Sequence, residues 1–127
     1  MKKVPKLPDA ELDVMLTLWT LEQPVRTSCI LTELQARRTW TASTLKVVLG
    51  RLVEKGIVEE TRQGRFTLYR TLLSEEEYRR SETKHMLGRF YGNSVKKLVA
   101  ALVQDEGLSG ADIAELEDIL RKAGKNL

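Results

Sequence analysis

The residue types best suited to chemistry lie between positions 39 and 70, where hydroxyls, a lysine and several arginines recur at helical and hairpin spacings. On a helix that begins after Thr41, Ser43 and Val47 lie opposite an apolar face, and Thr44 and Lys46 flank them. Hydroxyls and cations bond to bases or phosphates, and an apolar side chain can contact a thymine methyl. This face can therefore enter a DNA groove, although an ordinary surface helix has the same pattern.

Arginines on and after the same helix suit a second kind of contact. Arg51, Arg62 and Arg65 are assigned to phosphates, which position a protein on DNA and make its affinity depend on salt. Trp40 either donates its indole N–H to a phosphate or is buried against the preceding helix. Gly50 costs about 1 kcal/mol of helix stability relative to alanine, and it either admits the groove wall or is merely tolerated. The expected DNA-binding residues are Trp40, Thr41, Ser43, Thr44, Lys46, Val47, Arg51, Arg62 and Arg65.

Residues that could catalyse a reaction are scarce elsewhere in the chain. His85 is the only histidine, and it lies among charged residues, so a surface or interface role is expected. Cys29, the only cysteine, lies next to an apolar stripe and is expected to be a small core residue. There is no cluster of metal ligands at suitable spacing and no glycine-rich phosphate loop. We therefore expect no enzyme activity, no metal and no cofactor.

The elements that position the basic stretch are three helices and a hairpin. The first helix is expected to begin at an Asp9 N-cap and to stop at Pro24. A short strand at 25–26 follows, then a second helix capped by Thr27 or Ser28. The third helix has Thr41 as its N-cap, and its apolar face is expected to comprise Leu45, Val48, Leu49, Leu52 and Val53.

Gly56 fits the C-cap of the third helix, where a left-handed conformation carries no Cβ penalty. Residues 57–61 then predict a strand, residues 62–65 a turn, and residues 66–71 the return strand. Three helices in about 50 residues followed by a hairpin are typical of a winged helix-turn-helix. The fold class expected for the chain is therefore mainly α with a small β-hairpin.

The remaining residues predict a helical tail. Ser74 and Glu77 form a capping box, and Asn93 or Ser94 and then Ser109 begin further helices. About 50 residues are too few for a large core of their own, so the apolar stripes predict burial against a second copy of the chain. Folding back onto the first half is the alternative. The expected domains are 1–73, which binds DNA, and 74–127, which dimerises through Phe90, Tyr91, Val95, Leu98, Val99, Leu102, Ile113, Leu116 and Leu120.

Composition limits the class of protein. The hydrophobic fraction of 42% indicates a folded chain, and the 31% of charged residues indicates a soluble one. The net charge of +3 is uneven, because residues 1–73 carry 12 Lys and Arg against 8 Asp and Glu, whereas residues 74–127 carry 9 against 10. The positive half is the one expected to meet a polyanion. No apolar run is long enough to insert into a bilayer, no secretory signal is present, and a cytoplasmic location is expected.

Three segments together carry a family resemblance. The segments LPDAELDVMLTLW, WTASTLKVVLGRLVEKGIV and GRFTLYRTLLSEEEY closely resemble the penicillinase-repressor family of the BlaI/MecI/CopY type. The resemblance extends over most of the chain, and it is far more specific than a generic winged helix. It implies a dimeric transcriptional repressor that places its third helix in the major groove of a palindromic operator.

The resemblance also implies a means of release. Members of this family are often inactivated when a membrane-bound sensor metalloprotease leads to cleavage in the dimerisation helices. In the beta-lactam-responsive members the cut falls at an Asn-Phe pair, and the matching positions here are Ala101 and Leu102. The copper-responsive branch carries a cysteine-rich C-terminal motif, whereas this chain ends RKAGKNL. The resemblance therefore does not assign the inducer.

Two functions of other kinds remain as alternatives. A winged helix can dock on a protein and act as an adaptor, although the hairpin arginines and the positive bias favour DNA. A repressor released by a small-molecule effector needs a ligand pocket, which the sequence does not reveal. Double-stranded operator DNA, a second copy of the chain and a sensor protease are the partners expected.

Overall fold

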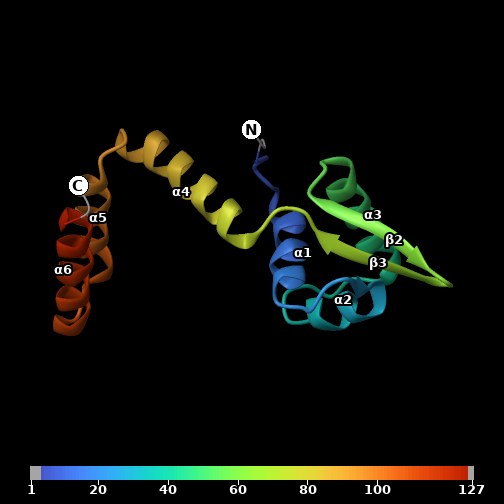
Figure 1. Cartoon of the computed structure of the whole chain (residues 1–127). Helices are drawn as coiled ribbons and strands as arrows, with labels where there is room; N and C mark the ends of the chain where they lie inside the picture. The colour runs from blue at the N-terminus through green and yellow to red at the C-terminus, as the bar shows by residue number, and fades with distance from the viewer. Residues whose placement is uncertain (1–3, 126–127) are drawn as a thin grey trace. The chain divides into compact units, whose positions relative to one another are not determined.

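The computed structural model describes residues 4–125, apart from the side chain of Glu106. The chain divides into two compact units, residues up to Thr83 and residues from Lys84 onward. The elements in chain order are α1 (Asp9–Trp19), β1 (Val25–Arg26), α2 (Thr27–Leu34), α3 (Ala42–Glu54), β2 (Val58–Gln63), β3 (Phe66–Thr71), α4 (Glu75–Tyr91), α5 (Val95–Glu106) and α6 (Gly110–Lys125) (Figure 1). The first unit is a winged helix-turn-helix followed by the start of α4, so the expected fold class is confirmed. No helix among the described residues is long and apolar enough to cross a membrane.

The core of the first unit joins α1, α2 and α3 to one end of the small sheet. Met15, Leu18, Ile30 and Leu34 are fully buried there. The predicted apolar face of α3 is confirmed, because its residues are buried or packed against this core: Leu45, Val48, Leu49, Leu52 and Val53. Burying this face turns the opposite face of the same helix outward.

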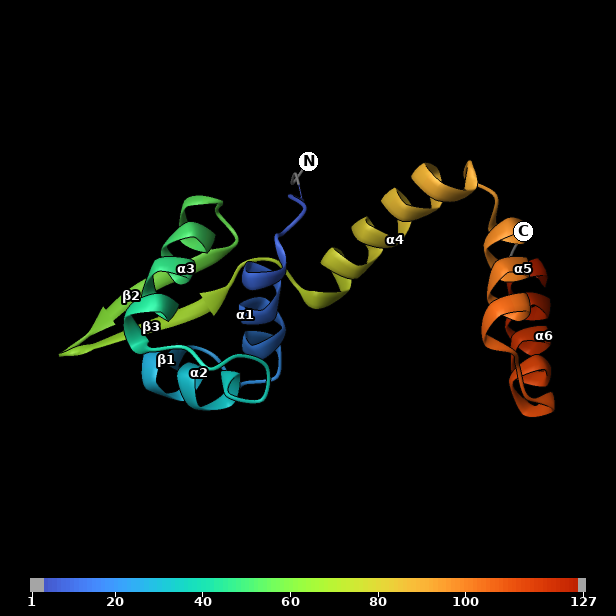
Figure 2. The same cartoon turned by 180° about the vertical axis from the view of Figure 1, so that it is seen from behind.

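The sheet has three antiparallel strands in the order β1-β3-β2. Gln63 lies opposite Phe66, which leaves a two-residue turn in which Gly64 has a φ of 63°. A glycine at the first turn position suits a type II′ hairpin, because its positive φ matches the twist of the strands. The strand therefore runs on to Gln63, and Arg62 lies within β2 rather than in the predicted turn. Both views show the hairpin tip projecting beyond the helices of its unit (Figures 1 and 2).

Both ends of α3 form as the sequence predicts. The Thr41 hydroxyl accepts a hydrogen bond from the Thr44 N–H at 3.2 Å, and this caps the N-terminus. Gly56 has a φ of 76°, its N–H bonds to the Val53 carbonyl, and the next N–H bonds to the Leu52 carbonyl. These two bonds are the Schellman pattern, which ends the helix and turns the chain into β2.

Three local expectations were wrong. Asp9 is the first residue of α1, which follows Pro8, and no side-chain hydrogen bond caps that end. Thr27 likewise lies inside α2, which follows Arg26. Pro8 and Arg26, with ψ of 155° and 152°, occupy the N-cap positions, so both helices begin one residue before the expected start and neither has a side-chain cap. Cys29 is exposed and not a core residue, because Ile30 takes the inward position of that turn.

The second unit contains the end of α4 and the helices α5 and α6, which lie side by side and antiparallel (Figures 1 and 2). The Ser94 hydroxyl accepts from the Lys97 N–H and begins α5. Ser109 and Asp112 cap α6 with two reciprocal hydrogen bonds. The capping serines predicted from the sequence therefore begin these helices.

Candidate nucleic-acid interface

The outward face of α3 presents the side chains expected to read DNA. Ser43, Thr44, Lys46 and Val47 are all exposed, and Val47 keeps 57% of its surface although it is apolar. Leu45 in the same turn is fully buried. The face is thus held outward by the core packing of the opposite side, and its first turn is fixed by the Thr41 cap.

Two groups of cations in the first unit differ in their partners. Arg38 pairs with Asp13 at 2.6 Å, Lys55 pairs with the buried Glu11, and Arg70 pairs with Glu59 at 3.1 Å. Among the residues that the structure describes, a second group forms no ion pair with a carboxylate: Lys46, Arg51, Arg62 and Arg65. These four are exposed and are among the expected DNA-binding residues. The first group serves the fold, and the second leaves positive charge for an external anion.

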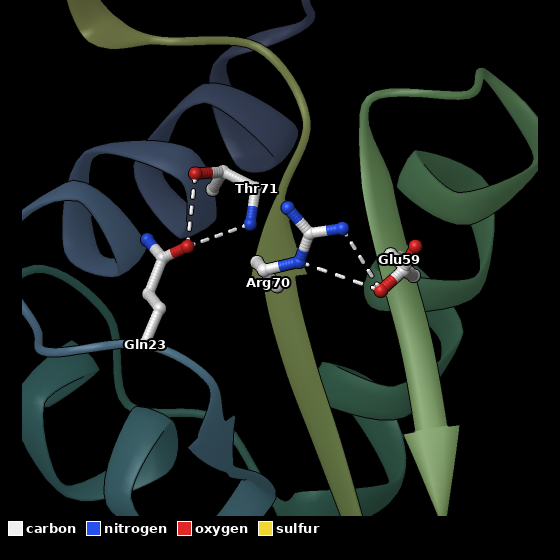
Figure 3. Close-up of polar contacts among 4 residues, drawn as sticks. All are labelled: Gln23, Glu59, Arg70 and Thr71. Atoms are coloured by element: carbon white, nitrogen blue, oxygen red, sulfur yellow. Dashed lines mark hydrogen bonds and ion pairs between the residues drawn. The ribbon is translucent and has the colours of Figure 1, made fainter.

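The base of the hairpin is anchored to the loop between α1 and β1. The side-chain carbonyl of Gln23 accepts hydrogen bonds from the Thr71 N–H at 2.7 Å and from the Thr71 hydroxyl at 3.0 Å (Figure 3). Arg70, the residue before Thr71 in β3, points to Glu59 across the hairpin, and so its guanidinium is neutralised (Figure 3). These contacts set the direction in which the hairpin leaves the core.

A recess of about 260 Å³ joins α3 to the hairpin. It is lined by Lys46 from α3, by Arg65 and Phe66 at the hairpin tip, and by Arg26 and Ser28 at the start of α2. Three cations thus surround a recess that has no carboxylate in its lining. The N-terminus of α2 adds first-turn backbone N–H groups that have no intrahelical acceptor, and the positive end of the helix dipole. This arrangement suits a phosphate group.

Arg26 is a candidate that the sequence reasoning missed. Its guanidinium lies 4.5 Å from the centroid of the Phe66 ring, and Phe66 is itself 47% exposed. The contact arises because β1 pairs with β3, in the register Arg26 opposite Leu68. The predicted strand at 25–26 was correct, but nothing in the sequence says that it adds to the hairpin. That pairing brings Arg26 to the hairpin tip.

Trp40 is partly buried and packs against the core. The Arg38 guanidinium lies 5.3 Å from the centroid of its ring, which covers part of the ring with a cation. The structure therefore supports the core role for the indole ring. Contact between its N–H and a phosphate stays a prediction.

The expected dimerisation residues in α5 and α6 lie largely in solvent. No side chain of α6 among the described residues is buried, and Leu120 is 63% exposed. Phe90 at the end of α4 is 70% exposed, whereas Tyr91 and Leu98 are half-buried. The other expected positions are each between 37% and 57% exposed: Val95, Val99, Leu102, Ile113 and Leu116. Ala101 is half-buried beside Leu102 in the middle of α5.

Comparison with known proteins agrees with this geometry. The family model described as "Penicillinase repressor" matches residues 7–122. The penicillinase repressor of Bacillus licheniformis is 33% identical over 122 residues, which are 96% of this chain and 94% of that protein. The methicillin resistance regulatory protein MecI of Mammaliicoccus sciuri is 28% identical over 94% of this chain and 97% of its own.

Solved structures show the same likeness for the first unit. The DNA-binding domain of the repressor BlaI in solution is 35% identical with a TM-score of 0.52, and the match covers 61% of this chain and 94% of that one. The Bacillus licheniformis BlaI monomeric form in complex with the blaP half-operator has a TM-score of 0.51 at 35% identity, with the same coverage. The winged-helix architecture is thus shared with proteins described as binding DNA.

Proposed function

The chain belongs to the penicillinase repressor family, and on that premise we propose that it represses transcription as a homodimer bound to a palindromic operator. The observation that carries the DNA-binding half of this proposal is the recess between α3 and the hairpin, where Arg26, Lys46 and Arg65 converge without a carboxylate. A surface of unpaired cations beside an outward helix face suits double-stranded DNA better than a protein partner.

In this proposal α3 enters the major groove and the hairpin follows the backbone. Ser43, Thr44, Lys46 and Val47 contact base edges, because the first turns of a recognition helix reach them. Arg62 and Arg65 bind phosphates from the hairpin, and Arg51 does so from the last turn of α3. Thr41 holds the first turn in place, and Trp40 supports it from the core side. The BlaI monomeric form solved in complex with the blaP half-operator supports DNA as the ligand.

The second half of the proposal is a dimer built by residues 74–127. Apolar side chains that are one-third to two-thirds exposed along α5 and α6 leave a surface that favours burial. A second copy of the same helices would cover it, as closed twofold symmetry allows. Two half-sites bound by one dimer then multiply the effective affinity.

Release is proposed to occur through this dimer surface. A cut between Ala101 and Leu102 would divide α5 and remove much of the apolar face, so operator binding would lose the gain from the second half-site. The protease expected from the family is a membrane-bound sensor metalloprotease. The protein itself is placed in the cytoplasm with its DNA, and no catalytic activity of its own is proposed.

The experiment that tests the function is a footprint on fragments of the genomic DNA, including the fragment upstream of its own gene. We expect one protected, twofold-symmetric site with half-site centres about one helical turn apart or a small multiple of it. Gel shifts at two salt concentrations accompany the footprint. Protection that lacks symmetry would contradict the dimer, and binding that is absent or insensitive to salt would contradict the DNA interface.

A further inference from the structure

A second cavity in the first unit lies away from the DNA-binding face. It has a volume of about 410 Å³ and is bounded by α1 and by the first turns of α4. Leu12, Leu16 and Trp19 form its apolar wall, and all three side chains are only partly buried. The volume is within the range of small-molecule sites, and an apolar wall with a few polar groups is their usual lining.

Aromatic rings stand at one end of this cavity. The rings of Trp19 and Tyr78 have centroids 6.0 Å apart and are tilted by 39°. Trp19 donates its indole N–H to the Leu73 carbonyl at 3.0 Å, and Tyr78 accepts from the Leu7 N–H at 3.1 Å. Both rings are therefore held in place before any ligand arrives, which lowers the cost of binding.

The charged groups of the lining are mostly acidic. Glu82 accepts a hydrogen bond from the Tyr78 hydroxyl at 2.8 Å, and Glu75 pairs with Arg79 at 3.1 Å. Since Arg79 is neutralised by Glu75, the carboxylate of Glu82 leaves the cavity with one uncompensated negative charge. Aromatic faces beside such a carboxylate attract cations.

We propose that this cavity binds a small amphipathic organic cation, with the apolar body against Leu12 and Leu16 and the charged group between Trp19 and Glu82. The site is made entirely of residues 12–83, so it belongs to one unit of the fold. It lies where α4 leaves the winged helix. It is separate from the surface to which DNA binding is assigned, and its existence does not depend on that assignment.

Three isosteric probes test the charge selectivity of the cavity. They are benzyltrimethylammonium, the neutral 2-methyl-1-phenyl-2-propanol and the anionic benzylphosphonate, each titrated into the full chain without DNA. The chain has two tryptophans, so its indole N–H groups give two signals in a nitrogen-15 correlation spectrum. We expect the cation to shift the Trp19 signal saturably while the Trp40 signal stays in place as an internal control. The alcohol should bind about three- to tenfold more weakly, because it lacks the charge.

Glu82→Gln is the diagnostic variant, because an amide oxygen still accepts from Tyr78 but the charge is lost. We expect its affinity for the cation to fall about three- to tenfold. Glu76→Gln, on the same helix but outside the cavity, is the matched control and should bind like the wild type. The proposal is overturned if the alcohol or the phosphonate binds as tightly as the cation, if Trp19 does not respond at any soluble concentration, or if the two variants behave alike.

Discussion

The cations around the recess give a quantitative prediction about salt. Each cation that contacts a phosphate releases a condensed counterion, and log K falls by about 0.9 per contact for each unit of log salt. Replacing Arg26, Lys46 or Arg65 by alanine should each lower this slope by about 0.9. Arg70 is the matched control in the same hairpin, because its guanidinium is already paired with Glu59 at 3.1 Å. Arg70→Ala should leave the slope unchanged.

The magnitude is large enough to measure. A slope of about 0.9 means that a fourfold rise in salt weakens binding about 3.5-fold per contact. Three contacts therefore account for about a 40-fold loss over the same interval, and removing all three should make binding correspondingly less sensitive to salt. The assay is fluorescence anisotropy of a labelled half-operator, which one DNA-binding unit occupies, at four or more salt concentrations. On a full palindromic operator each change in slope should double, because two copies of the chain contribute.

The three positions are expected to differ in their effect on sequence preference. Replacing Arg26 or Arg65 by alanine should weaken binding to specific and to nonspecific DNA to the same extent, because phosphates carry no sequence information. Lys46 lies on the outward face of α3 that we propose reads the bases, so Lys46→Ala should also reduce the preference for operator over random DNA. A slope that stays at the wild-type value in all three variants would refute the assignment of the recess to phosphates. A changed slope in Arg70→Ala would refute the distinction between paired and unpaired cations.

Three other predictions concern stability and assembly. Leu120→Glu places a charge on the exposed apolar face of α6. We expect sedimentation to show folded monomers that bind a single half-site, whereas a stable dimer would exclude that face from the interface. Gly50→Ala should raise the free energy of unfolding in urea by about 1 kcal/mol, because an added Cβ meets no atom within 4 Å; an unchanged midpoint would contradict this. Burial raises the pKa of both Tyr69 and Tyr78. The charge of Glu60 raises the pKa of Tyr69 further, whereas for Tyr78 the Leu7 N–H partly offsets burial and the hydrogen bond to Glu82 adds to it. Because the folded state keeps these protons to a higher pH, their contribution to stability is complete below pH 10 and is lost as pH rises through the raised pKa. The melting temperature of the double Tyr→Phe variant should therefore fall less steeply above pH 10 than that of the wild type.

Some details of the first unit escaped prediction because they depend on pairings between distant segments. The two-residue strand β1 has no pattern that names its partner, yet its pairing with β3 moves Arg26 to the hairpin tip. Arg70 and Arg65 look alike in the sequence, and only the position of Glu59 across the hairpin makes one of them a structural residue. The apolar residues next to Cys29 predict that it lies in the core, but Ile30 takes the inward position in that turn of α2 and Cys29 is exposed.

Local sequence by itself determined the helices, the caps of α3, α5 and α6, the hairpin and the outward face of α3. The physical reason is that capping hydroxyls, a positive-φ glycine and the 3.6-residue apolar period act within a few residues of one another. Only the tertiary structure decided which cations remain free and where they converge. It also decided that Trp19, Tyr78 and Glu82 line one cavity. Most of these features depend on contacts between segments that are far apart in the sequence, from 25 residues for Arg38 and Asp13 to 71 for Leu7 and Tyr78, and their geometry follows from the packing of the whole unit.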